Sequence, residues 1–151
     1  MAPDVSILVV DDDKVDQMTI RRAFKKGKLA SPLYSANDGM EALAMLRGQD
    51  GFQRVRKPYI ILLDLKMPRM NGLEFLGELR RDPQHKHAII FVLTSSRDEQ
   101  DKLRAYDEHV AGYIVKSKVS KEFLEVISLL DCYRRIVEIP AKWEVAACPA
   151  G

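Results

Sequence analysis

The sequence predicts an α/β domain with a doubly wound, five-stranded parallel sheet and helices on both faces. Five short apolar runs alternate with longer amphipathic stretches along the 151 residues. The runs are apolar at nearly every position, as expected for strands buried on both faces, whereas half-exposed strands alternate polar and apolar residues. Parallel neighbours need a crossover connection, and the amphipathic stretches supply helices of the right length for it.

The five expected strands are rich in β-branched residues and leucine, which favour extended backbone. The second strand is the weakest by composition. The strands are expected at Val5–Val10, Pro32–Ala36, Tyr59–Leu63, Ala88–Leu93 and Gly112–Val115.

The five expected helices carry apolar residues at spacings of three and four. Asp13 is expected to cap the first helix, the string Asn37-Asp38-Gly39 is a turn and N-cap signal for the second, and glycine or proline follows several helix ends. The last helix has an apolar stripe wider than one sheet contact needs. The helices are expected at Lys14–Lys26, between Gly39 and Gly48, at Gly72–Arg81, Arg97–His109 and Ser120–Val137, and Pro140 ends the pattern.

Composition excludes several classes of function. The chain has 24 Lys plus Arg against 22 Asp plus Glu, a net charge of +2, which does not favour a nucleic-acid partner. No apolar run approaches the roughly 20 residues that span a bilayer, and no secretory signal is readable, so we expect no membrane partner and a cytoplasmic location. Cys132 and Cys148 are interpreted as free thiols, and His85 and His87 as solvated side chains in a loop.

Polar side chains follow four of the five expected strands. They are Asp11, Asp12 and Asp13 after the first, Asp64 after the third, Thr94 and Ser95 after the fourth, and Lys116 after the fifth. Ligands of such sheets bind at the carboxyl ends of the strands. Two carboxylates about 4 Å apart repel by roughly 4 kcal/mol at an effective dielectric constant near 20, so a cation is expected among them. Oxygen ligands without a nearby His or Cys favour Mg²⁺.

The same side chains are suited to phosphoryl transfer. Lys116 can hold a phosphoryl oxygen, and the Thr94 hydroxyl can donate a hydrogen bond to another. A carboxylate can itself be the nucleophile, which gives an aspartyl phosphate, and either Asp64 or Asp11 can take that role. If Asp64 is the acceptor, Asp11 and Asp12 hold the metal, and the Lys66 backbone carbonyl can add a ligand.

Four segments resemble the receiver domain of bacterial two-component response regulators. They are Ile7–Asp12, Ile61–Pro68 with Asn71-Gly72, Val92–Ser95 and Gly112–Lys116. The resemblance implies the flavodoxin-like sheet order 2-1-3-4-5, a receiver domain over residues 1–139, and a tail over residues 140–151 with no effector domain. It also implies a stand-alone phosphoacceptor that signals through protein contacts, not a turnover enzyme.

The resemblance implies a role for each polar residue at the strand ends. Asp64 looks like the phosphoacceptor; Asp12, Asp64, the Lys66 carbonyl and, through water, Asp11 like metal ligands; Thr94, Ser95 and Lys116 like phosphoryl-binding groups; and Thr94 with Tyr113 like the switch pair. One departure stands at Ser117, where receiver domains usually carry proline. The geometry of the Lys116-Ser117 peptide is therefore open.

Within the family, the chain looks most like the small regulators paired with cyanobacterial and bacterial phytochrome kinases. The segment Arg47–Lys57, the string Tyr106–Val110 and Lys116-Ser117 carry this likeness. It implies a histidine kinase, of the phytochrome type, as the phosphodonor. The wide stripe of the last helix leads us to expect a homodimer through the face of the fourth helix, fifth strand and fifth helix.

Two other functions stay open. The string Asp11–Val15 also fits the D-x-D-x-V pattern of haloacid-dehalogenase-like phosphatases, in which Asp11 would be the nucleophile. That interpretation needs a further acidic strand end after Lys116 and leaves Asp64 unexplained. The other function is a receiver-like module that binds a partner without being phosphorylated. This alternative stays open because Ser117 stands where receiver domains usually carry proline.

Overall fold

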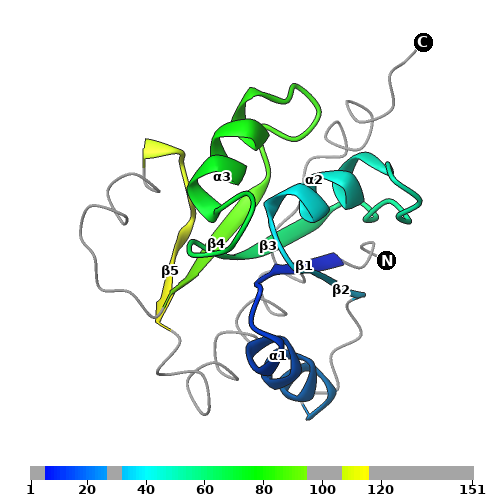
Figure 1. Cartoon of the computed structure of the whole chain (residues 1–151), viewed down its shortest axis with the longest axis vertical. Coiled ribbons are helices and arrows are strands. Elements are labelled where there is room, and N and C mark those ends of the chain that lie inside the picture. The colour runs from blue at the N-terminus through cyan, green and yellow to red at the C-terminus, as the bar shows by residue number, and fades with distance from the viewer. Residues whose placement is uncertain (1–5, 27–31, 95–106, 116–151) are drawn as a thin grey trace.

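The computed structural model describes residues 6–26, 32–94 and 107–115, and within them five strands form one parallel sheet in the order β2-β1-β3-β4-β5 (Figure 1). This order and the parallel pairing confirm the predicted sheet. The strands are β1 (Ser6–Val10), β2 (Leu33–Ala36), β3 (Tyr59–Asp64), β4 (Ile89–Thr94) and β5 (Gly112–Val115).

At their carboxyl ends, β3 and β4 each extend one residue further than the apolar runs predicted. Asp64 pairs with Leu93 across the β3–β4 ladder, and Thr94 pairs with Val115 across the β4–β5 ladder. Because backbone pairing continues past the last apolar side chain, these two polar residues end their strands instead of following them. A boundary drawn from hydrophobicity alone stops too early here.

Helices cover both faces of the sheet, as predicted. α1 (Lys14–Lys26) lies on one face, and α2 (Gly39–Arg47) and α3 (Gly72–Arg81) lie on the other (Figure 1). Most of the predicted fourth helix, the whole predicted fifth helix, the dimer face that includes them and the tail fall outside the described residues. Within the residues that the structure describes, no helix is both long and apolar enough to cross a membrane.

Two apolar clusters explain why the strands are apolar throughout. Successive strand residues point to opposite faces, so each strand contributes to both clusters. Under α1, the buried members are Ile7, Val9, Ile20, Ala23, Phe24, Ile60, Leu62 and Leu93. Against α2 and α3, the fully buried members include Leu8, Val10, Ile61, Leu63, Phe75, Leu76 and Leu79.

Side-chain oxygens cap all three helices at their starts. The Asp13 carboxylate accepts hydrogen bonds from the Val15 and Asp16 amides at 2.8 and 3.4 Å, which confirms its predicted role. Asp38 caps α2 as predicted, and Gly48 ends that helix in the left-handed conformation at φ 66°. Asn71 forms a capping box at the start of α3.

Replacing Asp13 by alanine is expected to lower the free energy of unfolding by about 1 kcal/mol, because two amides at the start of α1 lose their acceptor. Asp13→Ser keeps a capping oxygen and should recover most of that loss. Urea unfolding of both variants measures the effect. Equal losses in the two variants would contradict the capping role.

Candidate functional site

Three carboxylates meet at the carboxyl ends of β1 and β3. Asp11 and Asp12 directly follow β1, Asp64 ends β3, and each offers an oxygen that lies within 4.8 Å of the others. Asp11 is fully buried and Asp64 is 6% exposed, whereas Asp12 is open to solvent. The cluster is therefore walled by protein on one side and accessible on the other.

The register of the sheet brings these acids together. β1 and β3 are parallel neighbours, and Val10 pairs with Leu63, so the residue that follows each one arrives at the same edge. The chain then turns on the acids themselves. An Asp11 carboxylate oxygen accepts from the Asp13 amide at 2.9 Å, and an Asp64 oxygen accepts from the Lys66 amide at 3.2 Å.

The electrostatics of this cluster favour a bound cation. Two unit charges at 4.8 Å repel by roughly 3 kcal/mol at an effective dielectric constant near 20, and burial strengthens that repulsion. Because a cation removes the repulsion and all three donors are hard oxygens, the cluster fits a divalent ion such as Mg²⁺ or Mn²⁺.

Gly72 lets α3 begin directly against the backbone of the cluster. A Cβ at this position would lie 2.5 Å from the Asp64 carbonyl oxygen and 2.6 Å from the Leu65 Cα, closer than real atoms approach. The Gly72 amide donates to the Leu65 carbonyl at 2.9 Å. The Asn71-Gly72 string was recognised in the sequence as part of a motif, but this close approach was not predicted.

The structure places the other predicted site residues to different extents. Thr94 ends β4 beside β3, and Tyr113 pairs with Val92 in the β4–β5 ladder, so their backbones lie on the expected strands. Ser95 and Lys116 fall outside the described ranges. Among the predicted site residues, the structure therefore brings together the side chains of three: Asp11, Asp12 and Asp64.

Gln17 contacts the site although sequence reasoning did not identify it. From the second turn of α1, its side-chain amide donates to the backbone carbonyl of Asp11. The same nitrogen lies 3.3 Å from the Ala36 carbonyl and 3.3 Å from the Asn37 side-chain oxygen. A glutamine within a helix gives no local signal of such contacts, which depend on how α1 packs over the strand ends.

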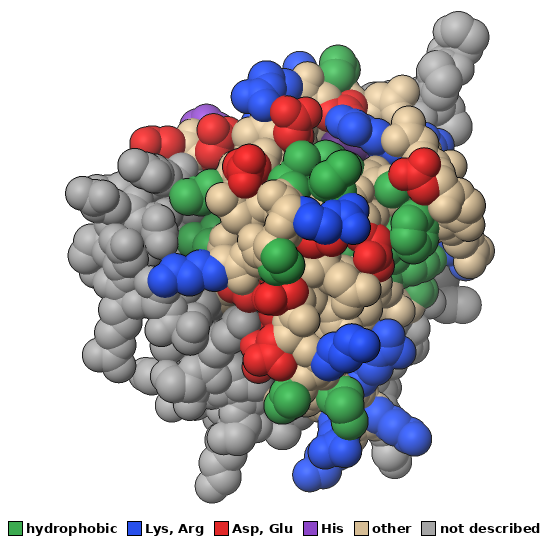
Figure 2. All heavy atoms as spheres, in the orientation of Figure 1, with side chains coloured by type: hydrophobic (Ala, Val, Ile, Leu, Met, Phe, Trp, Pro, Cys, Tyr) green, Lys and Arg blue, Asp and Glu red, His purple; other side chains and the backbone are tan. Residues whose placement is uncertain are grey.

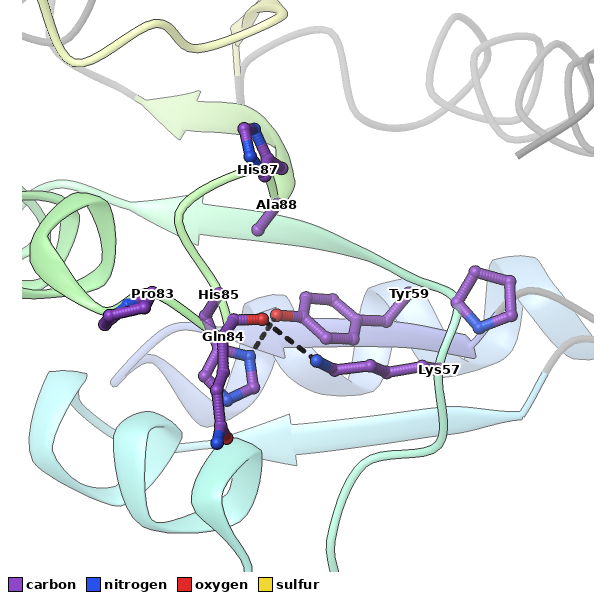
Figure 3. Close-up of a pocket in the computed structure, with 8 residues that line it drawn as sticks. Lys57, Tyr59, Pro83, Gln84, His85, His87 and Ala88 are labelled. Carbon is purple, nitrogen blue, oxygen red and sulfur yellow. Dashed lines mark hydrogen bonds between the residues drawn. The ribbon is translucent and has the colours of Figure 1, made fainter. Parts of the chain in front are cut away.

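A cavity of about 50 Å³ lies at the opposite edge of the sheet, at the amino ends of β3 and β4 (Figure 3). His85 projects toward Tyr59 there, and its Nδ1 lies 2.6 Å from the Tyr59 hydroxyl. His85 is only 2% exposed, so the prediction that it is solvated was wrong. The turn residues after α3 bury its ring beside Tyr59, whereas His87 is exposed as predicted.

Burial controls the protonation of this pair. It lowers the pKa of His85 to about 4, and the nearby Lys57 charge acts in the same direction. Burial also raises the pKa of Tyr59, so both side chains are uncharged at neutral pH. The pair is therefore a neutral contact at the amino edge of the sheet, where the Tyr59 hydroxyl and the His85 ring share one hydrogen bond.

Known proteins resemble this chain in both sequence and structure. A family model described as the response regulator receiver domain matches residues 7–128. Response regulator Rcp1 of Synechocystis sp. is 31% identical over 140 residues, which cover 92% of this chain and 95% of that protein.

Two solved structures are similar along their whole length. The Mn²⁺-bound form of Rcp1 has a TM-score of 0.77 and 32% identity, and a phosphorylated cyanobacterial phytochrome response regulator, RcpA, has a TM-score of 0.80 and 31% identity. In both cases the match covers 92% of this chain and all of the other.

His85 makes stability depend on pH in a defined window. Because its pKa is about 4 when folded and about 6.5 when unfolded, the unfolded chain binds a proton below pH 6.5 that the folded protein excludes until about pH 4. The contribution is complete above pH 6.5 and falls by up to about 3 kcal/mol as the pH drops to 4.

Urea unfolding at several pH values tests this expectation. His85→Gln should flatten the decline between pH 6.5 and 4, whereas His87→Gln, at the exposed neighbour, should keep it. The same slope in His85→Gln and the wild type would contradict the assignment.

Proposed function

The chain belongs to the response regulator receiver domain family, and from this premise we propose that Asp64 accepts a phosphoryl group from a histidine kinase with Mg²⁺ bound beside it. Receiver domains are signalling phosphoacceptors, not turnover enzymes, and they bind a divalent metal. The observation that carries the proposal is the convergence of Asp11, Asp12 and Asp64 within 4.8 Å at the carboxyl edge of the sheet.

The proposed roles are those that the family resemblance implies. Asp12 and Asp64 would ligate Mg²⁺ directly, Asp11 would act through water, and the Lys66 carbonyl would add a ligand. When bound, the ion offsets the negative charge of the cluster and of the incoming phosphoryl oxygens. An Asp64 carboxylate oxygen attacks phosphorus, the bond from phosphorus to the kinase imidazole nitrogen breaks, and that nitrogen keeps the electron pair.

The rest of the phosphoryl-binding set is proposed on family position. Thr94, Ser95 and Lys116 bind the phosphoryl oxygens, and Thr94 with Tyr113 forms the switch pair. Support comes from the strands: β4 and β5 follow β3 in the sheet, so their carboxyl ends lie along the same edge as Asp64. The phosphatase alternative, with Asp11 as nucleophile, is not favoured, because the receiver family model includes Asp64 and matches most of the chain.

We further propose that the kinase is of the phytochrome type. The similarity to RcpA, a cyanobacterial phytochrome response regulator, and the coverage of almost the whole length of Rcp1 support this proposal. The kinase would be expected to dock beside the acidic cluster, since its phosphorylated imidazole must reach Asp64.

A surface suited to that docking lies on α1. Val15 is 69% exposed and Met18 is 50% exposed, three residues apart on the same side of the helix and close to the acids that precede it. Figure 2 shows hydrophobic side chains exposed over α1, flanked by Lys and Arg. Exposed apolar groups beside a reactive site are typical of a protein contact surface.

Asp64→Ala should abolish labelling by acetyl phosphate and MgCl₂, because the acceptor oxygen is removed. Asp11→Ala should keep labelling at a rate lowered about tenfold, since a group that supports the metal is lost. Intact-mass spectrometry measures the product, and EDTA serves as the metal-free control. Labelling that persists in Asp64→Ala and disappears in Asp11→Ala would support the phosphatase instead.

Met18→Lys should slow phosphotransfer from the phosphorylated kinase about tenfold, the effect of losing a good apolar interface contact. Met40 on α2 is a matched control, because it is 51% exposed but belongs to the opposite face of the sheet. Met40→Lys should change the kinase rate less than twofold. Acetyl phosphate labelling reports the integrity of the site in each variant, and equal slowing by both substitutions would exclude docking on α1.

A further inference from the structure

The turn between β2 and α2 contacts both sides of the acidic cluster, although no predicted site residue follows β2. This turn is taken to include Asn37, Asp38 and Gly39, the residue at which α2 begins. On one side it meets the chain that leaves β1 with Asp11. On the other it meets residues 65–71, the loop that follows Asp64 and includes Lys66.

On the first side, Gln17 and the strand backbone make the contacts. The Asp11 amide donates to the Ala36 carbonyl at 3.0 Å. The Gln17 amide group joins the Asp11 carbonyl to the Ala36 carbonyl and the Asn37 side chain. The end of β1 is thereby held to the start of the turn.

On the second side, an ion pair and a backbone hydrogen bond make the contacts. Arg69 Nε lies 3.3 Å from Asp38 Oδ2, and the Asp38 side chain is only 7% exposed. The Gly39 amide donates to the Met70 carbonyl at 3.1 Å, and a Cβ on Gly39 would lie 2.8 Å from Met70 Cγ. The turn and the loop are thus packed without room for a side chain between them.

The backbone of Arg69 indicates that its position is imposed. Its φ of 64° is in the left-handed region, which a non-glycine residue occupies when surrounding contacts determine it. The ion pair with Asp38 is such a contact, and Arg69 lies three residues after Lys66 in the sequence. Strained conformations of this kind gather at functional sites.

We propose that the Arg69–Asp38 ion pair is a positioning element for the metal site, holding the 65–71 loop so that the Lys66 backbone stays beside Asp64. The inference rests on the proposed function, in which the Lys66 carbonyl is a metal ligand. Mg²⁺ accepts only near-ideal octahedral geometry, so a small shift of this loop weakens binding. Arg69 and Asp38 act through Lys66 and touch neither metal nor phosphate.

A second Arg–Asp pair in the structure provides a matched control. Arg47 Nε lies 3.1 Å from Asp82 Oδ2, beyond the C-terminal end of α3 and away from the acidic cluster. In each pair the other carboxylate oxygen accepts a backbone amide at 2.9 Å, from Glu41 at Asp38 and from Gln84 at Asp82. Both pairs thus join an arginine Nε to an aspartate that also accepts a backbone amide, although the Arg47 side chain is 33% exposed and that of Arg69 is 61% exposed.

The experiment compares Mg²⁺ affinity across these two pairs in the full chain. Asp38→Asn keeps a capping oxygen, since Asn and Asp cap equally well, and removes the charge that Arg69 contacts. MgCl₂ is titrated while amide NMR shifts are followed, and thermal unfolding without metal is recorded for each variant. Arg69→Ala, the double variant and Arg69→Lys complete the set, with Asp82→Asn and Arg47→Ala as controls.

Asp38→Asn and Arg69→Ala are each expected to weaken Mg²⁺ binding roughly tenfold, the usual cost of losing support behind a metal ligand. The double variant should be no weaker than either single variant, because both remove one interaction. Arg69→Lys should recover most of the affinity, and the two controls should stay within twofold of the wild type.

Wild-type affinity in both Asp38→Asn and Arg69→Ala would overturn the positioning role and leave the proposed function intact. Equal weakening in Asp82→Asn would also overturn it, because the loss would then follow from general destabilisation. Failure of the proposed function is distinct: wild-type protein would bind no Mg²⁺, and acetyl phosphate would not label Asp64.

Discussion

The parallel register between β1 and β3 is the constraint on which the site depends. Val10 lies opposite Leu63, so the residues that follow them, Asp11 and Asp64, are brought side by side. The apolar clusters on both faces hold that register, because a slip of one residue would turn every buried side chain of a strand toward the wrong face. The free energy gained by burying the apolar clusters thus outweighs the repulsion among the carboxylates of the site.

The two edges of the sheet solve different physical problems. The carboxyl edge gathers like charges and leaves Asp12 exposed, an arrangement that favours a cation and a phosphoryl group. The amino edge instead buries a neutral pair, Tyr59 with His85, in which no charge needs a partner. The proposed chemistry lies at the edge where the strands end, as in other open α/β sheets.

Much of the fold and the acidic cluster could be predicted from the sequence, because both depend on local patterns. Continuous apolar runs indicated the buried strands, and Asp13 and Asp38 indicated helix starts. What could not be predicted depends on contacts between segments distant in sequence. The burial of His85 against Tyr59, the contact of Gln17 with the end of β2 at Ala36 and the ion pair of Arg69 with Asp38 each join residues 19 or more positions apart.

Gly72 has a consequence for mutational scans of this protein. A Cβ at this position would clash with the main chain of Asp64 and Leu65, so any bulkier residue must displace the segment that bears the Asp64 carboxylate. An inactive variant at this position would resemble the loss of a chemical group, although glycine has no side chain to contribute. Such a result would report a steric requirement of the main chain, and structural measurements would be needed to tell it from a true reactive residue.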